Sequence, residues 1–317
     1  MSALPSTAPV GRRPATTGDR GPRPAVARRG GRLLAACFLA PTVVGIAVFT
    51  LLPIVGSLVL TFFSWNAIDP PRWIGADNYV EMVGDHTVLT SFANTLVFVA
   101  AAVILQLAVA LALAMAVTAR MPARLQTVFR SAFFFPLVLS AASISIVMKY
   151  LFNQDFGIIN HLLALVGAAP VPWLTSETWA PVTVVLVYVW QQFGFTFLLF
   201  LGGLNNIPKE IYEAADIDGA IGWRRLARIT VPLLSPTVLV ASVVAIINAL
   251  QVFDQPYVLA RGGPGDATRS VVLVIYQSAF EQLRFGYASA IGVLLFLLII
   301  AVTAAQFRLT RRFVFYQ

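Results

Sequence analysis

Polar and aromatic side chains lie inside two long apolar runs of this sequence, and their types could recognise a solute. They are Tyr188, Gln191, Gln192 and Phe195 in the first run, and Asn248 and Gln251 in the second. Gln192 and Phe195 are three positions apart, as are Asn248 and Gln251, so each pair shares one side of a helix. Amides hydrogen-bond hydroxyl groups, and aromatic faces stack on the apolar faces of sugar rings. The pattern predicts a carbohydrate pathway; the alternative is that the amides only join helices to one another.

A charged segment, Pro208–Pro236, separates these two apolar runs. Its first part predicts a helix over Lys209–Ile217, which ends near Gly219 because glycine accepts the left-handed conformation that terminates helices. A second short helix is expected over Gly222–Ile229, closed by Pro232. Two short helices joined at a glycine would form a protruding knob.

The composition indicates an integral membrane protein. Of the 317 residues, 58% are hydrophobic and 11% are charged, whereas soluble domains carry about 25% charged residues. The single cysteine, Cys37, excludes an internal disulfide and any cysteine-built metal site, and we expect it to be a small buried residue.

Six apolar runs are long enough to cross a bilayer, for which a helix needs about 20 residues. They cover residues 34–63, 90–118, 128–150, 180–202, 233–254 and 286–308. The first contains Pro41 and Pro53 and is expected to be kinked. A further stretch, Gly157–Ala169, is too short to span and is expected to be an interfacial helix outside the membrane. The sequence therefore predicts an all-α, polytopic six-span helical bundle with a helix-turn-helix loop, for which the family resemblance described below implies a cytoplasmic coupling role.

The distribution of basic residues predicts the orientation of the chain. With both termini in the cytoplasm, seventeen of the 22 Lys and Arg residues lie on the cytoplasmic side, as the positive-inside rule requires. The formal charge of +8 is therefore a topology signal, and we expect no nucleic acid as a partner. We expect a multi-pass protein of the bacterial plasma membrane, with its N- and C-termini inside.

The charged segment resembles the EAA signature of permease subunits of bacterial binding-protein-dependent ABC importers. The matching residues are Glu213-Ala214-Ala215, Asp218-Gly219-Ala220, Ile229, Pro232 and Pro236. The resemblance implies that this loop is cytoplasmic and docks on an ATPase subunit through Glu213, Ala214, Ala215, Asp218 and Gly219. Further segments resemble the sugar branch of the family, among them Asn78-Tyr79, Asp155 to Asn160, Phe253-Asp254 and Gly262-Gly263-Pro264.

The resemblance also implies the partners and the division of the chain. A second homologous permease, an ATPase dimer that holds ATP and Mg, an extracytoplasmic solute-binding protein, a sugar-like substrate and membrane lipid are expected. Residues 1–32 would be a disordered basic tail, 33–89 the first span and an external segment, and 90–308 a core with five spans and the EAA loop at 203–236. Residues 309–317 would be a cytoplasmic tail.

The sequence argues against catalysis by this chain. Neither lysine, Lys149 or Lys209, follows a glycine as a phosphate-binding loop requires. His86 and His161 are isolated, so no metal site is expected. A stand-alone secondary transporter remains the alternative, although the predicted spans contain no Asp or Glu except Asp254 at an edge. A membrane enzyme has less support, because no catalytic constellation is present.

Overall fold

The computed structural model describes residues 26–118 and 121–310. The chain divides into two compact units, residues 1–55 and 56–317. The expected tails fall mostly outside the described residues, but helix α1 already begins at Val26, inside the segment 1–32 that we expected to be disordered. Helix α14 likewise continues to Thr310.

The described part of the first unit is one helical stretch. It comprises α1 (Val26–Ile46), the π-helical turn η1 (Ala47–Leu51) and the start of α2 (Leu52–Leu60), which runs past the end of the unit. The π-helical turn lies between Pro41 and Pro53, where we expected a kink. Cys37 is exposed, so the expectation that it is buried was wrong: the described part of its unit holds no second helix to cover it.

The second unit begins with the end of α2, which a small hairpin follows: β1 (Phe63–Ser64) and β2 (Arg72–Trp73), paired antiparallel with Phe63 opposite Trp73. The helices that follow are α3 (Asp77–Gly84), α4 (His86–Thr118), α5 (Ala123–Val138), α6 (Ala141–Leu151), α7 (Ile158–Leu165), α8 (Trp179–Asn205), α9 (Lys209–Ile217), α10 (Trp223–Arg225), α11 (Val231–Leu233), α12 (Ser235–Leu250), α13 (Val271–Tyr276) and α14 (Phe285–Thr310). Three further π-helical turns are η2 (Leu226–Thr230), η3 (Pro256–Ala260) and η4 (Gln277–Glu281).

Four helical stretches of the described chain are long and apolar enough to cross a membrane: Ala36–Leu60, His86–Thr118, Trp179–Asn205 and Phe285–Leu309. The predicted third and fifth spans are instead bent pairs. Helices α5 and α6 meet at 99°, and the stretch Trp223–Leu233 meets α12 at 73°. Counting each bent pair as one span gives the predicted six.

The bend before α12 corrects one expectation. Pro232 does not close the second short helix, because helical structure continues to Leu233 and the break falls at Leu234. The π-helical turn η2 directly precedes α11 and shifts the hydrogen-bond register there. The helix can therefore continue through Pro232, although proline has no N–H to donate.

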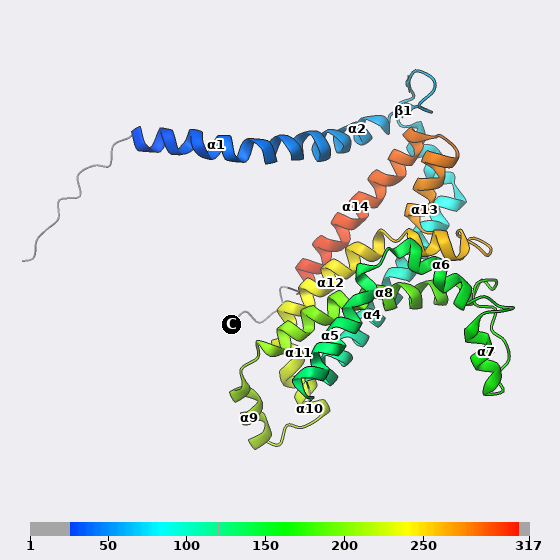
Figure 1. The fold of residues 1–317 in the computed structure, drawn as a ribbon. Helices are drawn as coiled ribbons and strands as arrows, with labels where there is room; N and C mark the ends of the chain where they lie inside the picture. The colour runs from blue at the N-terminus through cyan, green and yellow to red at the C-terminus, as the bar shows by residue number, and fades with distance from the viewer. Residues whose placement is uncertain (1–25, 119–120, 311–317) are drawn as a thin grey trace, which may run out of the picture. The chain divides into compact units, whose positions relative to one another are not determined.

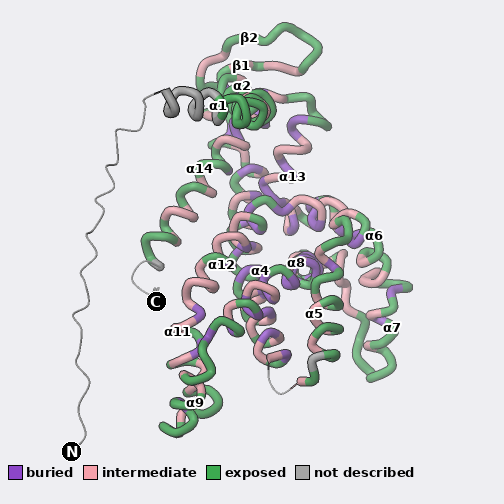
Figure 2. The backbone as a smooth tube through the Cα atoms, turned by 60° about the vertical axis from the view of Figure 1, so that its left-hand side comes forward, coloured by how far each residue is buried: buried purple, intermediate pink, exposed green. Residues whose placement is uncertain are grey.

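Helices α4 and α8 form the centre of the second unit, and α5 and α12 pack against them (Figure 1). Figure 2 shows that buried residues gather along α4, α8 and α12, whereas α9 is mostly exposed. Helix α8 approaches α5 closely at Gly194, where a Cβ atom would lie 2.2 Å from the carbonyl oxygen of Phe133. Buried polar pairs join the helices: Gln106 Nε2 donates to Thr196 Oγ1 across α4 and α8 at 2.8 Å.

Helix α7 forms within the expected interfacial stretch Gly157–Ala169 and presents exposed apolar residues such as Leu162 and Leu165. It is anchored by Asn160, whose side chain is buried. The Asn160 amide donates to the carbonyl oxygens of Gln154 and Val171 and accepts from the Val171 N–H and the Trp173 indole N–H, at 2.8 to 3.1 Å.

Candidate functional site

The segment Pro208–Pro236, here called the knob, lies at one end of the bundle, and α13 lies at the other (Figures 1 and 2). Helix α9 has the predicted bounds, Lys209–Ile217, with Pro208 as its N-cap. Gly219 then turns the chain with φ +68°, and Gly222 caps the next helix with φ +56°. Both values lie in the left-handed region that glycine adopts without strain.

One side of the knob packs against the bundle. Ala215 is buried, and Ile211 and Tyr212 pack on a core cluster that includes Leu204 and Leu234. This contact seats α9 on the ends of α8 and α12.

A second contact fixes the two knob helices to each other. Arg225 Nη1 lies 2.7 Å from Asp216 Oδ1, and the Arg225 guanidinium lies 5.6 Å from the centroid of the Tyr212 ring. Because each helix is held at more than one point, the knob can move as one body with the ends of α8 and α12.

The other side of the knob is open. Of the five predicted coupling residues, all but Ala215 are exposed. Three large apolar side chains accompany them: Ile217 is 87% exposed, Ile221 69% and Trp223 77%. The sequence analysis did not select these three, although large apolar residues in a charged segment are a signal of an interaction surface.

The predicted pathway residues fall into two groups. Tyr188 and Gln191 are buried, with 2% and 3% of their surface exposed. The Tyr188 ring packs edge-on against Phe98 at 5.1 Å between centroids, and its hydroxyl has no hydrogen-bond partner within the described residues.

Gln191 joins three segments at the bend between α5 and α6. Its Nε2 donates to the carbonyl oxygen of Leu139, which follows α5, at 3.3 Å. Its Oε1 accepts from Gln255 Nε2 at 2.7 Å, and Gln255 is also 3% exposed. We call Gln191 and Gln255 the amide clasp. Gln191 therefore joins helical segments to one another, which is the alternative to a pathway role that the sequence left open.

The remaining four pathway residues are accessible. Phe195 is 39% exposed, Gln192 is half-buried, and Asn248 and Gln251 are exposed. No hydrogen bond joins the two on α8 to the two at the end of α12 in the part of the chain that the structure describes. Helices α8 and α12 nevertheless share a core cluster, in which Tyr188 packs with Ala245 and other residues.

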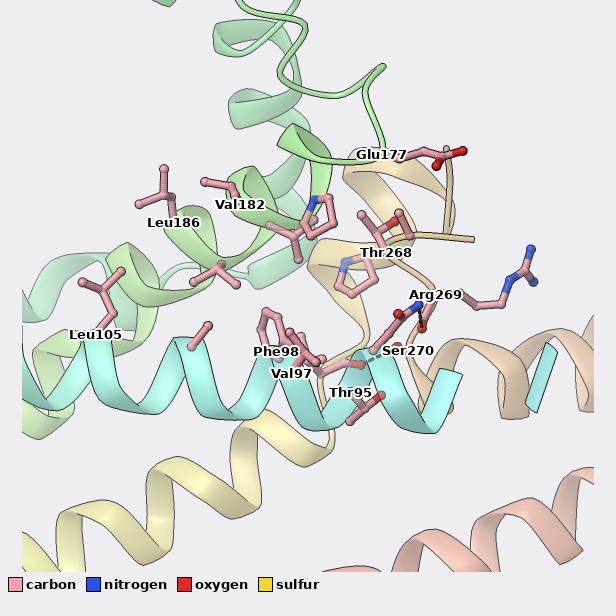
Figure 3. Close-up of a pocket in the computed structure, with 18 residues that line it drawn as sticks. Thr95, Val97, Phe98, Leu105, Glu177, Val182, Leu186, Thr268, Arg269 and Ser270 are labelled. Atoms are coloured by element: carbon pink, nitrogen blue, oxygen red, sulfur yellow. Dashed lines mark hydrogen bonds between the residues drawn. The ribbon is translucent and has the colours of Figure 1, made fainter. Parts of the chain in front are cut away.

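A separate, mainly apolar cavity of about 500 Å³ lies between α4, α8 and the loop before α13 (Figure 3). Leu105 and Leu186 lie at one end of it, and Glu177 and Arg269 at the other. Among the described residues that line it, none is a predicted pathway residue.

Arg269 at the polar end of this cavity is already paired. It lies 2.7 Å from Asp266 Oδ1, and its Nη1 donates to Gln277 Oε1. Its charge is therefore matched within the chain rather than free for an anionic solute.

At the end opposite the knob, charged residues connect α3, α4 and α14. Asp85 accepts from the Thr87 N–H at 2.8 Å, as an N-cap does, and from the Tyr287 hydroxyl at 2.8 Å. Burial raises the pKa of Asp85, but these hydrogen bonds outweigh it and leave the pKa below its ordinary value. Arg284 pairs with Glu81 beside it.

No group of three or more His, Cys, Asp or Glu side chains that could hold a metal ion occurs within residues 26–118 and 121–310. The geometry is therefore that of a helical bundle with a rigid, partly apolar knob at one end and accessible amides and rings along two central helices.

Comparisons with known proteins agree with this geometry. Residues 107–315 match the family of binding-protein-dependent transport system inner membrane components. The sulfoquinovosyl glycerol transport system permease protein of Agrobacterium fabrum is 34% identical, over 89% of this chain and 92% of that protein. The lactose transport system permease protein of Rhizobium radiobacter is 33% identical, over 86% and 93%.

A solved structure shares the fold. The crystal structure of a bacterial ABC transporter that imports the acidic polysaccharide alginate contains a chain that superposes with a TM-score of 0.79 at 22% identity, covering 90% of this chain and 98% of that one. The family match and the permease relatives together show that this chain belongs to the binding-protein-dependent transport system inner membrane components.

Proposed function

We propose that this chain is one of two homologous permease subunits of an ATP-driven bacterial importer for a neutral sugar or sugar derivative. In this proposal ATP and Mg are bound by a separate ATPase dimer, and an extracytoplasmic binding protein delivers the solute. The names of the permease relatives support a sugar: besides the two above, the trehalose/maltose transport system permease protein of Thermococcus litoralis is 31% identical over 86% of this chain.

The open side of the knob carries the proposal. Ile217, Ile221 and Trp223 are highly exposed, in the same segment as the exposed carboxylates Glu213 and Asp218. A cluster of large apolar side chains rimmed by charges is typical of a protein interface, and tryptophan is enriched among the residues that dominate binding. The ATPase subunit is the partner that this surface fits.

The packed side of the knob supplies the coupling. Because Ala215, Tyr212 and Ile211 rest on the ends of α8 and α12, a displacement of the knob reaches the two helices that carry the accessible amides. A closing ATPase dimer would thereby favour one of two membrane conformations, which is what alternating access requires.

The pathway itself is assigned to Gln192, Phe195, Asn248 and Gln251, the accessible four of the six predicted residues. A neutral solute fits them better than an anion, because amides and rings carry no charge. Arg269, which lines the separate apolar cavity, is paired with Asp266.

Family membership favours this proposal over a stand-alone secondary transporter. The family consists of components of binding-protein-dependent systems, so the chain is a translocation subunit and not an enzyme. The spans that the structure describes also contain none of the carboxylates that ion-coupled transporters use, since Asp254 lies beyond the end of α12 at Leu250.

The decisive experiment purifies the tagged chain from its native membrane in mild detergent and identifies its companions by mass spectrometry. We expect one homologous permease and two copies of an ATPase for each copy of this chain, and ATP-dependent sugar uptake after reconstitution with the binding protein. Recovery of the chain alone, active in liposomes without ATP, would favour the secondary transporter.

A matched pair of variants tests the knob within the same complex. Ile217→Asp should release the ATPase and abolish uptake. Ile68→Asp, which changes an equally exposed isoleucine (78%) in the β1–β2 hairpin, should do neither. Equal losses from both variants would argue against the knob as the docking surface.

Orientation is tested with single cysteines in a Cys37→Ser background. A membrane-impermeant maleimide added to intact cells should label Gln282→Cys and spare Glu213→Cys. The opposite pattern would place the knob outside and contradict the proposed topology.

A further inference from the structure

Six aromatic side chains from four segments form a continuous row at the end of the bundle opposite the knob. In order of contact they are Trp65, Phe285, Phe280, Tyr276, Tyr257 and Phe253. Each ring touches the next, with centroid separations of 5.5, 6.1, 5.4, 5.3 and 5.2 Å along the row. We call these residues the aromatic row.

The row does not belong to the hydrophobic core. Helix α13 and the turn η4 bury aliphatic and small side chains, namely Val271, Leu273, Val274, Ser278 and Ala279. Tyr276 and Phe280 lie on the other side of the same stretch, and Phe280 is 64% exposed. None of the six residues of the row is buried. The other five rings are partly exposed, so the row lies at the surface of the bundle and Phe280 is its most accessible ring.

One end of the row adjoins the proposed pathway. Phe253 follows Gln251 by two positions, at the point where α12 ends. There Phe253, Tyr257 and Tyr276 all contact one another, with Phe253 and Tyr257 stacked face to face, and the row continues from Tyr276 to the exposed Phe280. A solute that stacked along it would reach the amides of α12 without leaving aromatic surface.

Two carboxylates accompany the rings. Asp254 follows Phe253 in the chain, and Glu281 follows Phe280. In the described part of the chain neither forms an ion pair, since the three pairs involve other residues. Carboxylates accept hydrogen bonds from hydroxyl groups and repel other anions. Rings beside free carboxylates suit a neutral, hydroxyl-rich ligand.

We propose that the aromatic row is a stacking lane for the pyranose rings of a neutral sugar, which passes along it to the amides of α8 and α12. This proposal depends on the proposed import of sugar, and it adds the residues along which the sugar enters. The lane differs from an aromatic belt at the membrane interface, because a belt needs rings that contact lipid but does not need them to bind sugar.

The test measures sugar binding directly, in the assembled complex with Cys37→Ser. A cysteine at Gln282, an exposed position beside the row, reports occupancy through its rate of reaction with a maleimide. Maltose, trehalose, lactose and the acidic disaccharide digalacturonate are the probes. The disaccharide that the complex imports should slow labelling about threefold or more at high millimolar concentration, as expected for a contact of one or two rings.

Four variants test whether sugar stacks on the Phe280 ring, whether protection is confined to the row, and whether Glu281 excludes an anionic sugar. Phe280→Leu keeps an apolar side chain but removes the flat face, so protection should vanish; Phe280→Trp should retain it. A cysteine at Gln154, near the equally exposed Phe156 but outside the row, should show no protection. Glu281→Gln should allow digalacturonate to protect.

The outcomes distinguish the lane from the proposed function. A complex that imports a disaccharide with ATP but shows no protection by it, or equal protection in Phe280→Leu, overturns the lane and leaves the import function standing. A complex that imports no neutral sugar overturns the sugar assignment and the lane together.

Discussion

The amide clasp should stabilise the bend between α5 and α6, and its removal gives a sharp prediction. Gln191→Leu removes the hydrogen bond to Gln255 and the weaker one to the Leu139 carbonyl oxygen. It also leaves the Gln255 amide buried without its partner. An unsatisfied buried polar group costs about 1–3 kcal/mol, and hydrogen bonds between membrane helices average about 0.6 kcal/mol. We therefore expect a loss of about 2 kcal/mol in the free energy of unfolding.

A double-mutant cycle isolates the clasp from simple changes in packing. Gln255→Leu should cost a similar amount, and the double variant should cost clearly less than the two single losses added together, because leucines leave no amide unpaired. The assay is unfolding of the purified chain in mixed detergent, followed by circular dichroism. Additive losses, or single variants as stable as the parent, would refute the account of the bend.

Three further predictions concern other parts of the chain. Gly219→Val should abolish uptake but not membrane insertion, because a residue with a Cβ at φ +68° costs about 1–2 kcal/mol and the knob would reorient; uptake and surface labelling measure both. Because the pKa of Asp85 is lower in the folded state, its stabilising effect is present above about pH 4 and is lost as the pH falls through the folded value. Asp85→Asn should be less stable at neutral pH and should lack this loss in acid, as melting curves across pH would show. Asn160→Leu should lower the free energy of unfolding by about 2–4 kcal/mol, since the Trp173 indole and the Val171 backbone lose their partner. His161→Leu, at an exposed position of the same helix, is the control, and thermal unfolding measures both.

The sequence predicted the elements whose determinants are local. Helix α9 has the expected bounds because Pro208 and Gly219 fix its ends by backbone geometry alone. The apolar runs likewise predicted the four continuous spans and the positions of the two bent pairs, since a run of about 20 apolar residues is recognised without knowing its neighbours.

The bends could not be predicted in the same way. Pro136 alone does not determine that α5 ends at Val138. The break is also stabilised by Gln191, 52 residues later in the chain, whose side-chain amide donates a hydrogen bond to the Leu139 carbonyl oxygen. The continuation of the knob helix through Pro232 similarly depends on the π-helical turn before it. Such features arise from tertiary contacts that spacing does not reveal.

In the candidate site, too, residue types could be predicted from the sequence but tertiary contacts could not. The type of residue identified amides and rings with the right chemistry, but only the fold separates the clasped Gln191 from its accessible neighbour Gln192. The exposed Ile217, Ile221 and Trp223 were missed because the sequence does not state which side of a short helix packs.

Gln192 itself argues for a second permease chain. It lies midway along α8, a helix long enough to cross the membrane, and its side chain is half-exposed. Its amide makes no side-chain hydrogen bond within the described residues. An unsatisfied amide in hydrocarbon costs several kcal/mol, so this side of α8 cannot lie against lipid tails. It must face either polar groups of another chain or a pathway that water and solute enter, and a pathway open on one side of a single bundle needs a second bundle to close it. Gln192→Leu should therefore leave assembly of the complex intact and impair uptake, whereas impaired insertion with normal uptake per inserted complex would show that the amide serves packing alone.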